Sequence, residues 1–397
     1  MSCFISNLPN NILEEIFCKL PITNLIQCRF VCKSWKHILG SPHFSKLQHQ
    51  LTDTVFCVEE IKKFNRYPSK EEYKRNIRWF EFKEKPSFIN LEGNCNIVPK
   101  SSDSSFQFRF INSCNGLVCV LAVPSYHIFP NAVFISIANP VTGESMHLPP
   151  LNKGRCLNWY LCGLGFSPKT NQFKAVRVSS EGQDCQAEVC TIGTISWRSI
   201  EAPLQLHDYF TQNNHDLRFK SVVFANGSLH WLVKRTELQS IEIWVFDLDT
   251  EKFRQMAAPP PFREEFENAG MIGACTYKDT LLVWASRTFL EVWQMKEYGV
   301  AESWTKILFI KERYAVLEPF IFLKNGDIVL LRCQDLYSYN PDKEKFTRLT
   351  DRGNPFQNSA TLIDGANGYD TVIKYEYRWF VHKPSFVSLK DTVAQDN

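Results

Sequence analysis

Apolar residues near the N-terminus recur with a helical period. In residues 9–50 they follow one another at intervals of three and four, which gathers them on one stripe of a helix. Pro21 interrupts the pattern and Ser41-Pro42 restarts it, so we predict four short helices. Thr23 is the expected N-cap of the second. Four helices of this length bury little surface by themselves, so a partner or a second domain should cover the apolar faces of the helices.

From about residue 53 the pattern changes to short runs rich in Val, Ile, Phe and Trp that end at turn residues, as in β-strands. Asn-Gly pairs and comparable turn signals predict hairpin turns at 115–116, 168–171, 226–227, 278–279, 325–326 and 367–368. Their spacing is typical of the blades of a β-propeller, in which one small sheet follows another around a ring.

A second element recurs between these turns: a strand, a polar turn and another strand that ends near Pro or Leu. Its clearest copies are NPVTGESMHLPP, DLDTEKFRQMAAPP and NPDKEKFTRL. Each repeat then holds four strands, and six such quartets fit between Phe106 and Leu389, with a further strand pair near 53–85. We expect residues 53–60 to close the ring against the last unit. A β-sandwich or two stacked domains would use similar strands, but the repeat spacing favours the propeller.

These two patterns predict an α+β multidomain protein. Residues 1–50 form a small helical domain, residues 51–390 an all-β propeller-like domain of about six blades, and residues 391–397 a C-terminal tail. We expect the helical head to sit outside the ring and the propeller to fold without relying on it, because the repeats of a propeller close on themselves.

The net charge of +3 comes from the head. Residues 1–50 hold five Lys or Arg residues against Glu14 and Glu15, whereas the remaining 40 basic and 40 acidic residues balance. The head therefore favours an acidic partner. Nucleic-acid binding is not expected, because no long basic stripe is present.

Membrane insertion and secretion are not expected either. A long stretch without charged residues, 111–143, is interrupted by polar residues and prolines, and the N-terminus lacks the basic and apolar regions of a secretory signal. The 14 cysteines include no Cys-x-x-Cys pair, which fits free thiols in a reducing compartment. We therefore expect a cytoplasmic and/or nuclear protein without membrane contact.

The head as a whole resembles an F-box. Its sequence, LPNNILEEIFCKLPITNLIQCRFVCKSWKHILGSPHF, contains Leu-Pro pairs at 8–9 and 20–21, the run Arg-x-Val-Cys-Lys-x-Trp at 29–35 and a closing Ser-Pro-x-Phe at 41–44. In the F-box family this domain docks on a Skp-type adaptor, which bridges to a cullin scaffold. The resemblance implies adaptor contacts by Leu8, Pro9, Ile12, Leu13, Ile16, Leu20, Pro21, Leu25, Val31, Cys32 and Trp35. Each could instead belong to the core of the head, and Ile16 and Val31 are expected to be partly core.

The body is similar to the F-box-associated, kelch-like domain of a large plant family. The segments SCNGLVCV, NPVTGE, GLGFSPKTNQFKAVRV, NGSLHWLV, FDLDTEKF and LEVWQMKEYGVAESWTKI carry this likeness over nearly all of residues 106–350. The Gly-Gly doublet of true kelch repeats is missing from each blade. Together the two resemblances imply the substrate-recognition subunit of a Skp-cullin-F-box ubiquitin ligase. Its propeller would bind an unknown protein substrate, and the chain would perform no covalent chemistry itself.

Enzymatic chemistry has little support in the sequence. No nucleophile elbow, His-Glu-x-x-His zinc pair or phosphate-binding glycine loop is present. His207, Asp208, His215 and Asp216 share one polar segment, but loop solvation explains them better than a metal, so we expect neither a metal nor another cofactor. The alternative function is a protein that binds the adaptor without recruiting cullin, or whose propeller senses a glycan or a small-molecule signal.

A substrate should bind to loops of the propeller, because loops vary while the sheets hold them rigid. The longest predicted loops are 203–219, 259–269, 123–131 and 151–160. They combine aromatic and arginine side chains, the common anchors of protein interfaces. We predict substrate contacts by Tyr126, Arg155, Trp159, Tyr209, Phe210, Arg263 and Phe266. Any one of these side chains could instead be tucked inward in a solvated loop.

Overall fold

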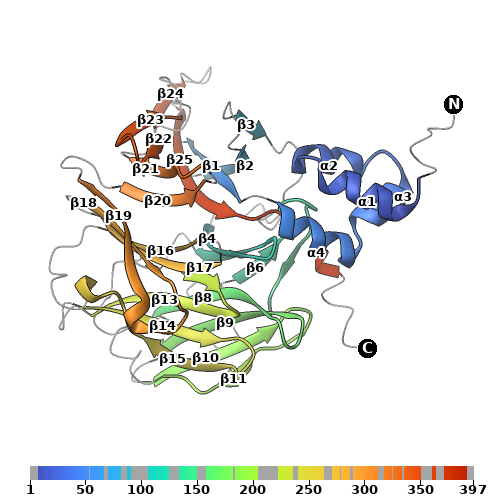
Figure 1. Cartoon of the computed structure of the whole chain (residues 1–397). Coiled ribbons are helices and arrows are strands. Elements are labelled where there is room, and N and C mark those ends of the chain that lie inside the picture. The colour runs from blue at the N-terminus through green and yellow to red at the C-terminus, as the bar shows by residue number, and fades with distance from the viewer. Residues whose placement is uncertain are drawn as a thin grey trace.

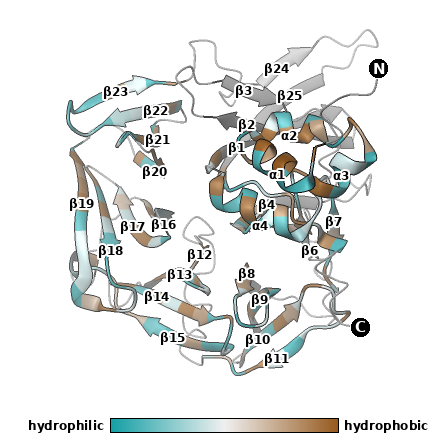
Figure 2. Cartoon of the chain, turned by 45° about the vertical axis from the view of Figure 1, so that its right-hand side comes forward, coloured by the Kyte–Doolittle hydropathy of each residue, from teal (hydrophilic) through white to brown (hydrophobic). Residues whose placement is uncertain are grey.

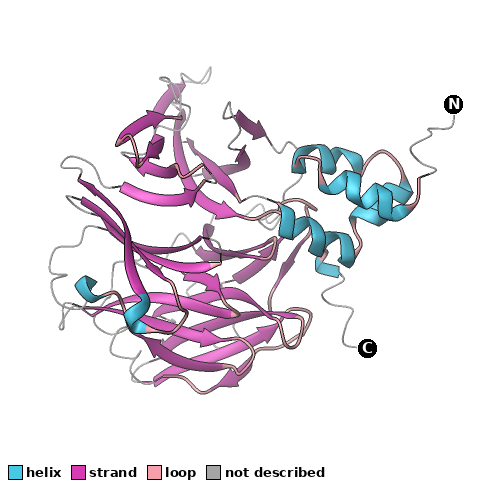
Figure 3. Ribbon diagram, viewed as in Figure 1, coloured by secondary structure: helices cyan, strands magenta, loops and turns pink. Residues whose placement is uncertain are grey.

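Four helices at one end of the chain and a ring of small β-sheets make up the protein (Figures 1 and 3). The computed structural model describes residues 8–52, 54–66, 70–81, 87–90, 106–124, 134–149, 158–181, 184–203, 222–235, 240–262, 271–277, 279–286, 289–311, 317–323, 325–332, 335–349, 360–363 and 371–390. Within these ranges, no helix has both the length and the apolar character that crossing a membrane would require.

The head consists of α1 (Asn10–Cys18), α2 (Ile22–Cys28), α3 (Lys33–Leu39) and α4 (Pro42–Leu51). Ser41-Pro42 starts α4 as predicted, and Ser41 caps it: its Oγ accepts a hydrogen bond from the backbone N–H of Phe44 at 3.1 Å. The predicted cap of α2 was wrong. This helix begins at Ile22 directly after Pro21, so Thr23 lies inside its first turn. Proline suits this position because it has no N–H that the start of a helix would leave without a partner.

Five sheets each contain four strands that are consecutive in the sequence. These strands are β4 (Phe106–Cys114), β5 (Leu117–Pro124), β6 (Phe134–Ala138) and β7 (Ser145–His147); β8 (Asn158–Ser167), β9 (Gln172–Glu181), β10 (Asp184–Thr191) and β11 (Arg198–Ile200); β12 (Val222–Ala225), β13 (Ser228–Arg235), β14 (Ser240–Asp247) and β15 (Lys252–Met256); β16 (Met271–Tyr277), β17 (Thr280–Ser286), β18 (Phe289–Met295) and β19 (Trp304–Lys311); and β20 (Leu317–Phe322), β21 (Ile328–Arg332), β22 (Asp335–Asn340) and β23 (Lys345–Arg348). Two short 3₁₀ turns, η3 (Pro260–Phe262) and η5 (Ala301–Ser303), lie between strands.

A sixth sheet joins the two ends of the chain. Its strand order is β24 (Ala360–Ile363), β25 (Thr371–His382), β1 (Val55–Arg66), β2 (Lys70–Glu81) and β3 (Ser87–Asn90). The antiparallel register of β1 and β25 runs from Val55 opposite His382 to Asn65 opposite Val372. Pairing of early and late strands in one sheet closes the ring and removes two free sheet edges.

The sheets follow one another around the ring in sequence order (Figure 2). The strands β4, β8, β12, β16, β20 and β25 contact each other in succession and line its inside. The predicted propeller-like domain of about six blades and its closure near residues 53–60 are therefore confirmed. The expected count of quartets was wrong: the described residues between Phe106 and Leu389 contain five, and the strand pair expected near 53–85 belongs to the closing sheet.

Two of the Asn-Gly pairs adopt the backbone conformation that their sequence predicts. Asn115 and Asn226 have φ of 45° and 47°, and the glycines after them have φ of 87° and 67°. Consecutive left-handed residues form the hairpin turn that matches the twist of two antiparallel strands. No residue with a side chain fits at position 116 without a shift of its neighbour, because a Cβ on Gly116 would lie 2.2 Å from the Cβ of Ser385. The predicted turn at 367–368 lies outside the described residues.

The second repeated element forms the strand pairs β6–β7, β14–β15 and β22–β23. Its first polar residue stabilises the turn in each copy. The Oδ1 atoms of Asn139, Asp247 and Asn340 accept hydrogen bonds from backbone N–H groups two or three residues later, at 2.7–2.9 Å. Short Asn and Asp side chains are favoured in turns because they can make this local bond.

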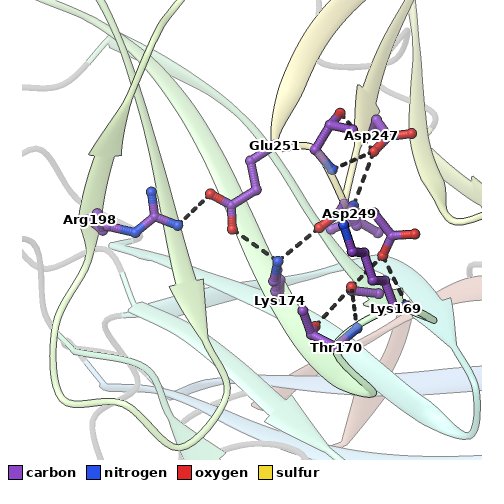
Figure 4. A network of polar contacts seen from close by, with 10 residues as sticks. Lys169, Thr170, Lys174, Arg198, Asp247, Asp249 and Glu251 are labelled. Atoms are coloured by element: carbon purple, nitrogen blue, oxygen red, sulfur yellow. Dashed lines mark hydrogen bonds and ion pairs between the residues drawn. The ribbon is translucent and has the colours of Figure 1, made fainter.

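The same turns also connect neighbouring sheets (Figure 4). Lys174 on β9 is 5% exposed, and its Nζ lies 2.9 Å from a carboxylate oxygen of Glu251, the residue just before β15. Glu251 also pairs with Arg198, and Asp249 accepts a hydrogen bond from the Ser167 hydroxyl. A buried ammonium group needs such partners to offset the loss of water. The contacts therefore hold the sheet of β8–β11 to the sheet of β12–β15.

Candidate protein-interaction site

Apolar side chains of α1 divide between two faces of the helix. Leu13 and Phe17 are buried, whereas Leu8, Ile12 and Ile16 recur every four residues and are 36%, 38% and 41% exposed. Residues four apart lie above one another on a helix, so Ile12 and Ile16 form one stripe, and Leu8 stands just before the start of α1. A helix that is apolar on two faces requires something to cover both. The inner face packs on the core, and no described residue covers the outer one.

The connection between α2 and α3 adds to the exposed apolar area of the head. Phe30 and Val31 are 85% and 63% exposed. We call Leu8, Ile12, Ile16, Phe30 and Val31 the head surface. Single exposed apolar residues are ordinary, but a group of this size on such a small domain indicates an interface.

The residues predicted to contact an adaptor fall into three groups. The exposed ones are Leu8, Pro9, Ile12, Ile16, Pro21 and Val31. Leu20, Cys32 and Trp35 are partly buried, and Leu13 and Leu25 are buried.

Two expectations about this set differ from the structure. Ile16 and Val31, expected to be partly core, are on the surface. Leu13 and Leu25 are 2% and 0% exposed, so in this conformation they hold their helices in place and offer no surface to a partner. Phe30 was missed, although it lies inside the Arg-x-Val-Cys-Lys-x-Trp run. The run's spacing fixes Arg29 and Val31 but says nothing of the residue between them.

Positive charge accompanies the head surface. Lys19, Lys33, Lys36 and Lys46 are all exposed. One of the two acidic residues, Glu14, lies 3.3 Å from Nδ1 of His43. A surface with exposed apolar groups and an excess of lysines suits a partner that offers an apolar groove and acidic side chains.

The head lies beside the ring and shares a core with it. A single apolar core joins Phe17 and Phe44 of the helices to Val118 of β5, Phe380 of β25 and Phe386 beyond it. The propeller therefore covers the inner apolar faces of the helices, as the small size of the head requires.

Residues 383–390, here called the C-terminal segment, follow β25 and pass between the head and the ring. Phe386 in this segment is 1% exposed. Its ring centroid lies 6.1 Å from that of Phe44 on α4, and the guanidinium carbon of Arg29 lies 5.8 Å from it. An aromatic pair and a cation over a ring each stabilise such a contact beyond simple burial.

The C-terminal segment is tied to the ring by the turn between β6 and β7. Asn139 Nδ2 donates hydrogen bonds to the backbone oxygens of Ser385 at 2.9 Å and Val387 at 2.7 Å. Glu144 accepts one from the backbone N–H of Leu389 at 2.8 Å. This copy of the repeated turn binds the segment in the way that the β14–β15 copy binds a neighbouring sheet.

Arg29 connects the head directly to the same turn. Its Nη1 donates a hydrogen bond to the backbone oxygen of Val141 at 3.4 Å. Burial lowers the pKa of Arg29, and the negative charge of Glu144 partly offsets this. Arg29 belongs to the Arg-x-Val-Cys-Lys-x-Trp run, so one residue of this run contacts the junction and is not part of the exposed surface.

Two histidines at this junction make its stability sensitive to acid. Burial lowers the pKa of His49 to about 4, and Lys383 acts in the same direction, while hydrogen bonds with Pro384 and Asn115 and the charge of Asp279 oppose it. Burial also lowers the pKa of His382 to about 3, and the neighbouring His49 adds to the effect. Both rings are neutral at pH 7. A histidine with a depressed folded-state pKa contributes stability above its unfolded pKa near 6.5, and this stability is lost as the pH falls.

We therefore expect the free energy of unfolding to decrease below pH 6.5, and to decrease less in His49→Gln than in the unaltered protein. The difference should approach about 3 kcal/mol near pH 4, because each pKa unit corresponds to about 1.4 kcal/mol. Chemical unfolding of both proteins at a series of pH values measures it. Parallel curves for the two proteins would show that His49 does not control this stability.

The head and the C-terminal segment lie at one of the two faces of the ring. Strands alternate in direction within each antiparallel sheet, so the connections between first and second strands share one face. β4 and β25 both end on that face, because Ser113 near the end of β4 is hydrogen-bonded to His382 at the end of β25. Gly116 also lies against Ser385 there. The head and the C-terminal segment thus lie at this face, which we call the turn face.

The segments predicted to bind substrate are flanked by strand ends on the opposite face. Pro124 ends β5, Ile200 ends β11, and Asn158 and Met271 begin the first strands of their sheets. Trp159 lies in β8 next to this face. The other predicted contacts, Tyr126, Arg155, Tyr209, Phe210, Arg263 and Phe266, lie outside the described residues, as does the polar segment with His207, Asp208, His215 and Asp216. Their roles stay predictions.

Groups suited to catalysis are scarce in the described part of the chain. Within it, no three His, Cys, Asp or Glu side chains come together as metal ligands. Burial raises the pKa of the Cys185 thiol to about 11 and that of Cys275 to about 12, which keeps both protonated. Burial also raises the pKa of Glu318 on β20 to about 7. The sequence did not point to Glu318, because it stands in an ordinary strand pattern.

Comparisons with known proteins match this architecture. Residues 5–47 match the model of the F-box domain, and residues 70–378 match the model of the F-box associated beta propeller domain. The putative F-box protein At1g33530 of Arabidopsis thaliana is 30% identical over 76% of this chain and 62% of its own length. Two other Arabidopsis thaliana proteins, F-box protein At3g07870 and F-box protein CPR1, are 23% and 24% identical. They cover 88% and 90% of this chain, and 89% and 88% of their own lengths.

Proposed function

The chain belongs to the family of F-box proteins with an F-box-associated β-propeller, and from this premise we propose that it is the substrate-recognition subunit of a Skp-cullin-F-box ubiquitin ligase. In this proposal the head surface binds a Skp-type adaptor, which connects the chain to a cullin scaffold. The face of the ring opposite the turn face binds the protein to be ubiquitinated.

The observation that supports the adaptor contact is the outer face of the head. Ile12 and Ile16 lie on one stripe of α1, Leu8 precedes the helix, and Phe30 and Val31 lie in the connection between α2 and α3; all five are exposed. Their exposure costs free energy in the isolated chain, and a partner that covers them recovers it at roughly 25 cal/mol per Å² of apolar surface. The exposed lysines around them favour an acidic surface on that partner.

The fixed junction supports the second half of the proposal. Because Phe386, Asn139 and Arg29 hold the head against the turn face, a bound adaptor keeps a defined position relative to the ring. A substrate held at the opposite face is then presented repeatedly at one place relative to the ligase. Such proximity raises the rate at which ubiquitin is transferred to the substrate, although the receptor performs no chemistry itself.

Reconstitution tests the function. The purified chain should form a stable complex with a Skp-type adaptor, and this pair should bind a cullin. Size-exclusion chromatography of the mixed proteins with light scattering measures both steps. An adaptor complex that fails to bind any cullin would instead support an interaction protein outside the ligase.

The receptor should carry no ubiquitin on a cysteine. A thiolate is the attacking species in thioester formation, and burial raises the pKa of thiols such as Cys18, Cys114 and Cys190. We expect no adduct that is lost on reduction when the chain is incubated with a ubiquitin-loaded conjugating enzyme, as read by mass spectrometry. Such an adduct on a single cysteine would show that the chain is itself a catalytic ligase.

A further inference from the structure

Exposed apolar side chains gather at a second place, far from the head. Among the described residues, the large apolar side chains outside the head surface that are more than a third exposed are Leu51, Ile195, Phe289, Val300, Ile307 and Phe309. Phe289, Ile307 and Phe309 lie in the sheet of β16–β19 and Val300 lies in the connection between β18 and β19, whereas Leu51 and Ile195 stand alone. A group of exposed apolar residues, unlike a single one, calls for a physical explanation.

The outer strand of this sheet is also unusually long. β19 has 8 residues, whereas the outer strands β3, β7, β11, β15 and β23 have 3 to 5. Proteins keep edge strands short because the unpaired backbone groups along an edge attract other strands. Within the described residues, β19 pairs with β18 on one side and with no strand on the other. It therefore offers a longer free edge than the outer strand of any other sheet of the ring.

Side chains along this edge form an apolar surface with positive charge. The rings of Phe289 and Phe309 stack with their centroids 5.5 Å apart. Lys306 Nζ lies 5.6 Å from the Phe309 ring and 2.7 Å from a carboxylate oxygen of Glu291, so this acidic group is already paired. Lys311 is exposed at the end of the strand. The edge thus has two lysines against one carboxylate.

The register of the two strands explains why one more apolar residue is exposed. Val292 pairs with Leu308 and Trp293 with Lys306, so Ile307 is an extra residue in β19. Such a bulge leaves a residue unpaired and turns its side chain away from the regular alternation. Ile307 is 37% exposed as a result, next to the exposed Lys306.

This edge lies away from the head. Figures 1 and 2 both show β19 and the helices on opposite sides of the molecule. The head core includes strands β5 and β25, and the sheet of β16–β19 is separated from both of their sheets by at least one other sheet of the ring. A partner on β19 therefore does not compete with an adaptor on the head surface.

We propose that β19 binds an extended segment of a protein partner as an additional strand, and that this segment alternates apolar with acidic residues. Backbone hydrogen bonds to the free edge would provide affinity, and Phe289 and Phe309 would receive the apolar side chains. Lys311 lies outside the Lys306–Glu291 ion pair and gives the edge a net positive charge, which favours acidic residues on the segment. The inference rests on the proposed receptor function: β18 begins at Phe289 and β19 ends at Lys311, so the edge reaches the face of the ring opposite the turn face, and the inference names the kind of substrate segment recognised there.

A display library of random peptides with the length of β19 tests the proposal on the full chain bound to its adaptor. We expect enrichment of peptides that alternate apolar and acidic residues, and loss of their binding when a central residue of the peptide is replaced by proline. Phe309→Ser should weaken binding by about tenfold or more, as expected for an aromatic anchor. Ile195→Ser, at the isolated exposed residue in the β10–β11 connection, should leave it unchanged.

Each other outcome is decisive against the proposal. Failure to enrich any peptide, or equal binding to Phe309→Ser, would show that β19 is not the site. A dimer of the chain that Phe309→Ser dissociates in sedimentation would show that a second copy occupies the edge. Adaptor binding is measured in the same samples: if it is retained while peptides fail to bind, only the role of β19 is wrong. If it is absent, the receptor function itself is wrong.

Discussion

Val31→Asp and Ile16→Asp should each abolish adaptor binding without destabilising the protein. Both side chains are exposed, at 63% and 41%, so their replacement should change the free energy of unfolding by only about 0.5 kcal/mol. In the complex, a carboxylate at an apolar anchor must either give up its bound water or keep the adaptor at a distance, and both cost several kcal/mol of binding free energy. Because about 1.4 kcal/mol corresponds to a factor of ten, affinity should fall by roughly two orders of magnitude or more.

Repulsion should add to this decrease in affinity if the adaptor is acidic, since each variant also reduces the positive charge of the head. The dissociation constant from titration calorimetry and the melting temperature of the same samples measure the two effects. Ile195→Asp is the matched control, because Ile195 is 93% exposed and lies in the β10–β11 connection of the ring, outside the head surface. Unchanged adaptor affinity in both head variants would rule out the head surface as the docking site.

Leu20 is a poorer place for this test, although the motif marks it equally. It is partly buried and packs against the core shared by head and ring. A charge there would unfold part of the head, and the absence of binding would not identify a surface. The structure thus separates motif residues that support the fold from those that face outward.

The periodic patterns predicted the elements and the ring, because repetition is a local signal that recurs. The helical stripes predicted four helices, and the Asn-Gly pairs marked turns whose left-handed backbone was then found at Asn115 and Asn226. Closure by residues near 53–60 could be predicted because a ring needs its ends paired. The number of quartets could not be predicted, because the closing sheet takes strands from both ends of the chain.

The pattern could not decide which apolar face of α1 is inside. Leu13 and Ile16 are equally apolar and lie three residues apart, yet they are 2% and 41% exposed. What separates them is packing against α3, α4 and the core that the helices share with the ring, which no local sequence signal records. The contact of Arg29 could not be predicted either, because its partner Val141 lies 112 residues away. The free edge of β19 likewise depends on the arrangement of the sheets and not on a local pattern.

Phe386→Ala should separate the unfolding of the head from that of the ring. Phe386 is 1% exposed and lies between Phe44 of α4 and Arg29, so its removal leaves a cavity in the core that joins the two domains. Truncation of a buried phenylalanine costs about 3–5 kcal/mol. A head of four short helices cannot replace this burial from its own residues, and we expect it to unfold at a lower denaturant concentration than the propeller.

Chemical unfolding followed by two probes measures this separation: helical circular dichroism for the head and tryptophan fluorescence for the ring, which holds most of the tryptophans in the sequence. Phe386→Leu is the matched control, because it keeps most of the apolar volume and should cost less than about 1.5 kcal/mol. Addition of a Skp-type adaptor should restore the head of Phe386→Ala, since a ligand that binds only the folded state stabilises it by mass action. A single transition at the position of the unaltered protein would show that the C-terminal segment does not support the head. A common early transition for both probes would show that the segment stabilises the whole ring, and that head and propeller unfold as one unit.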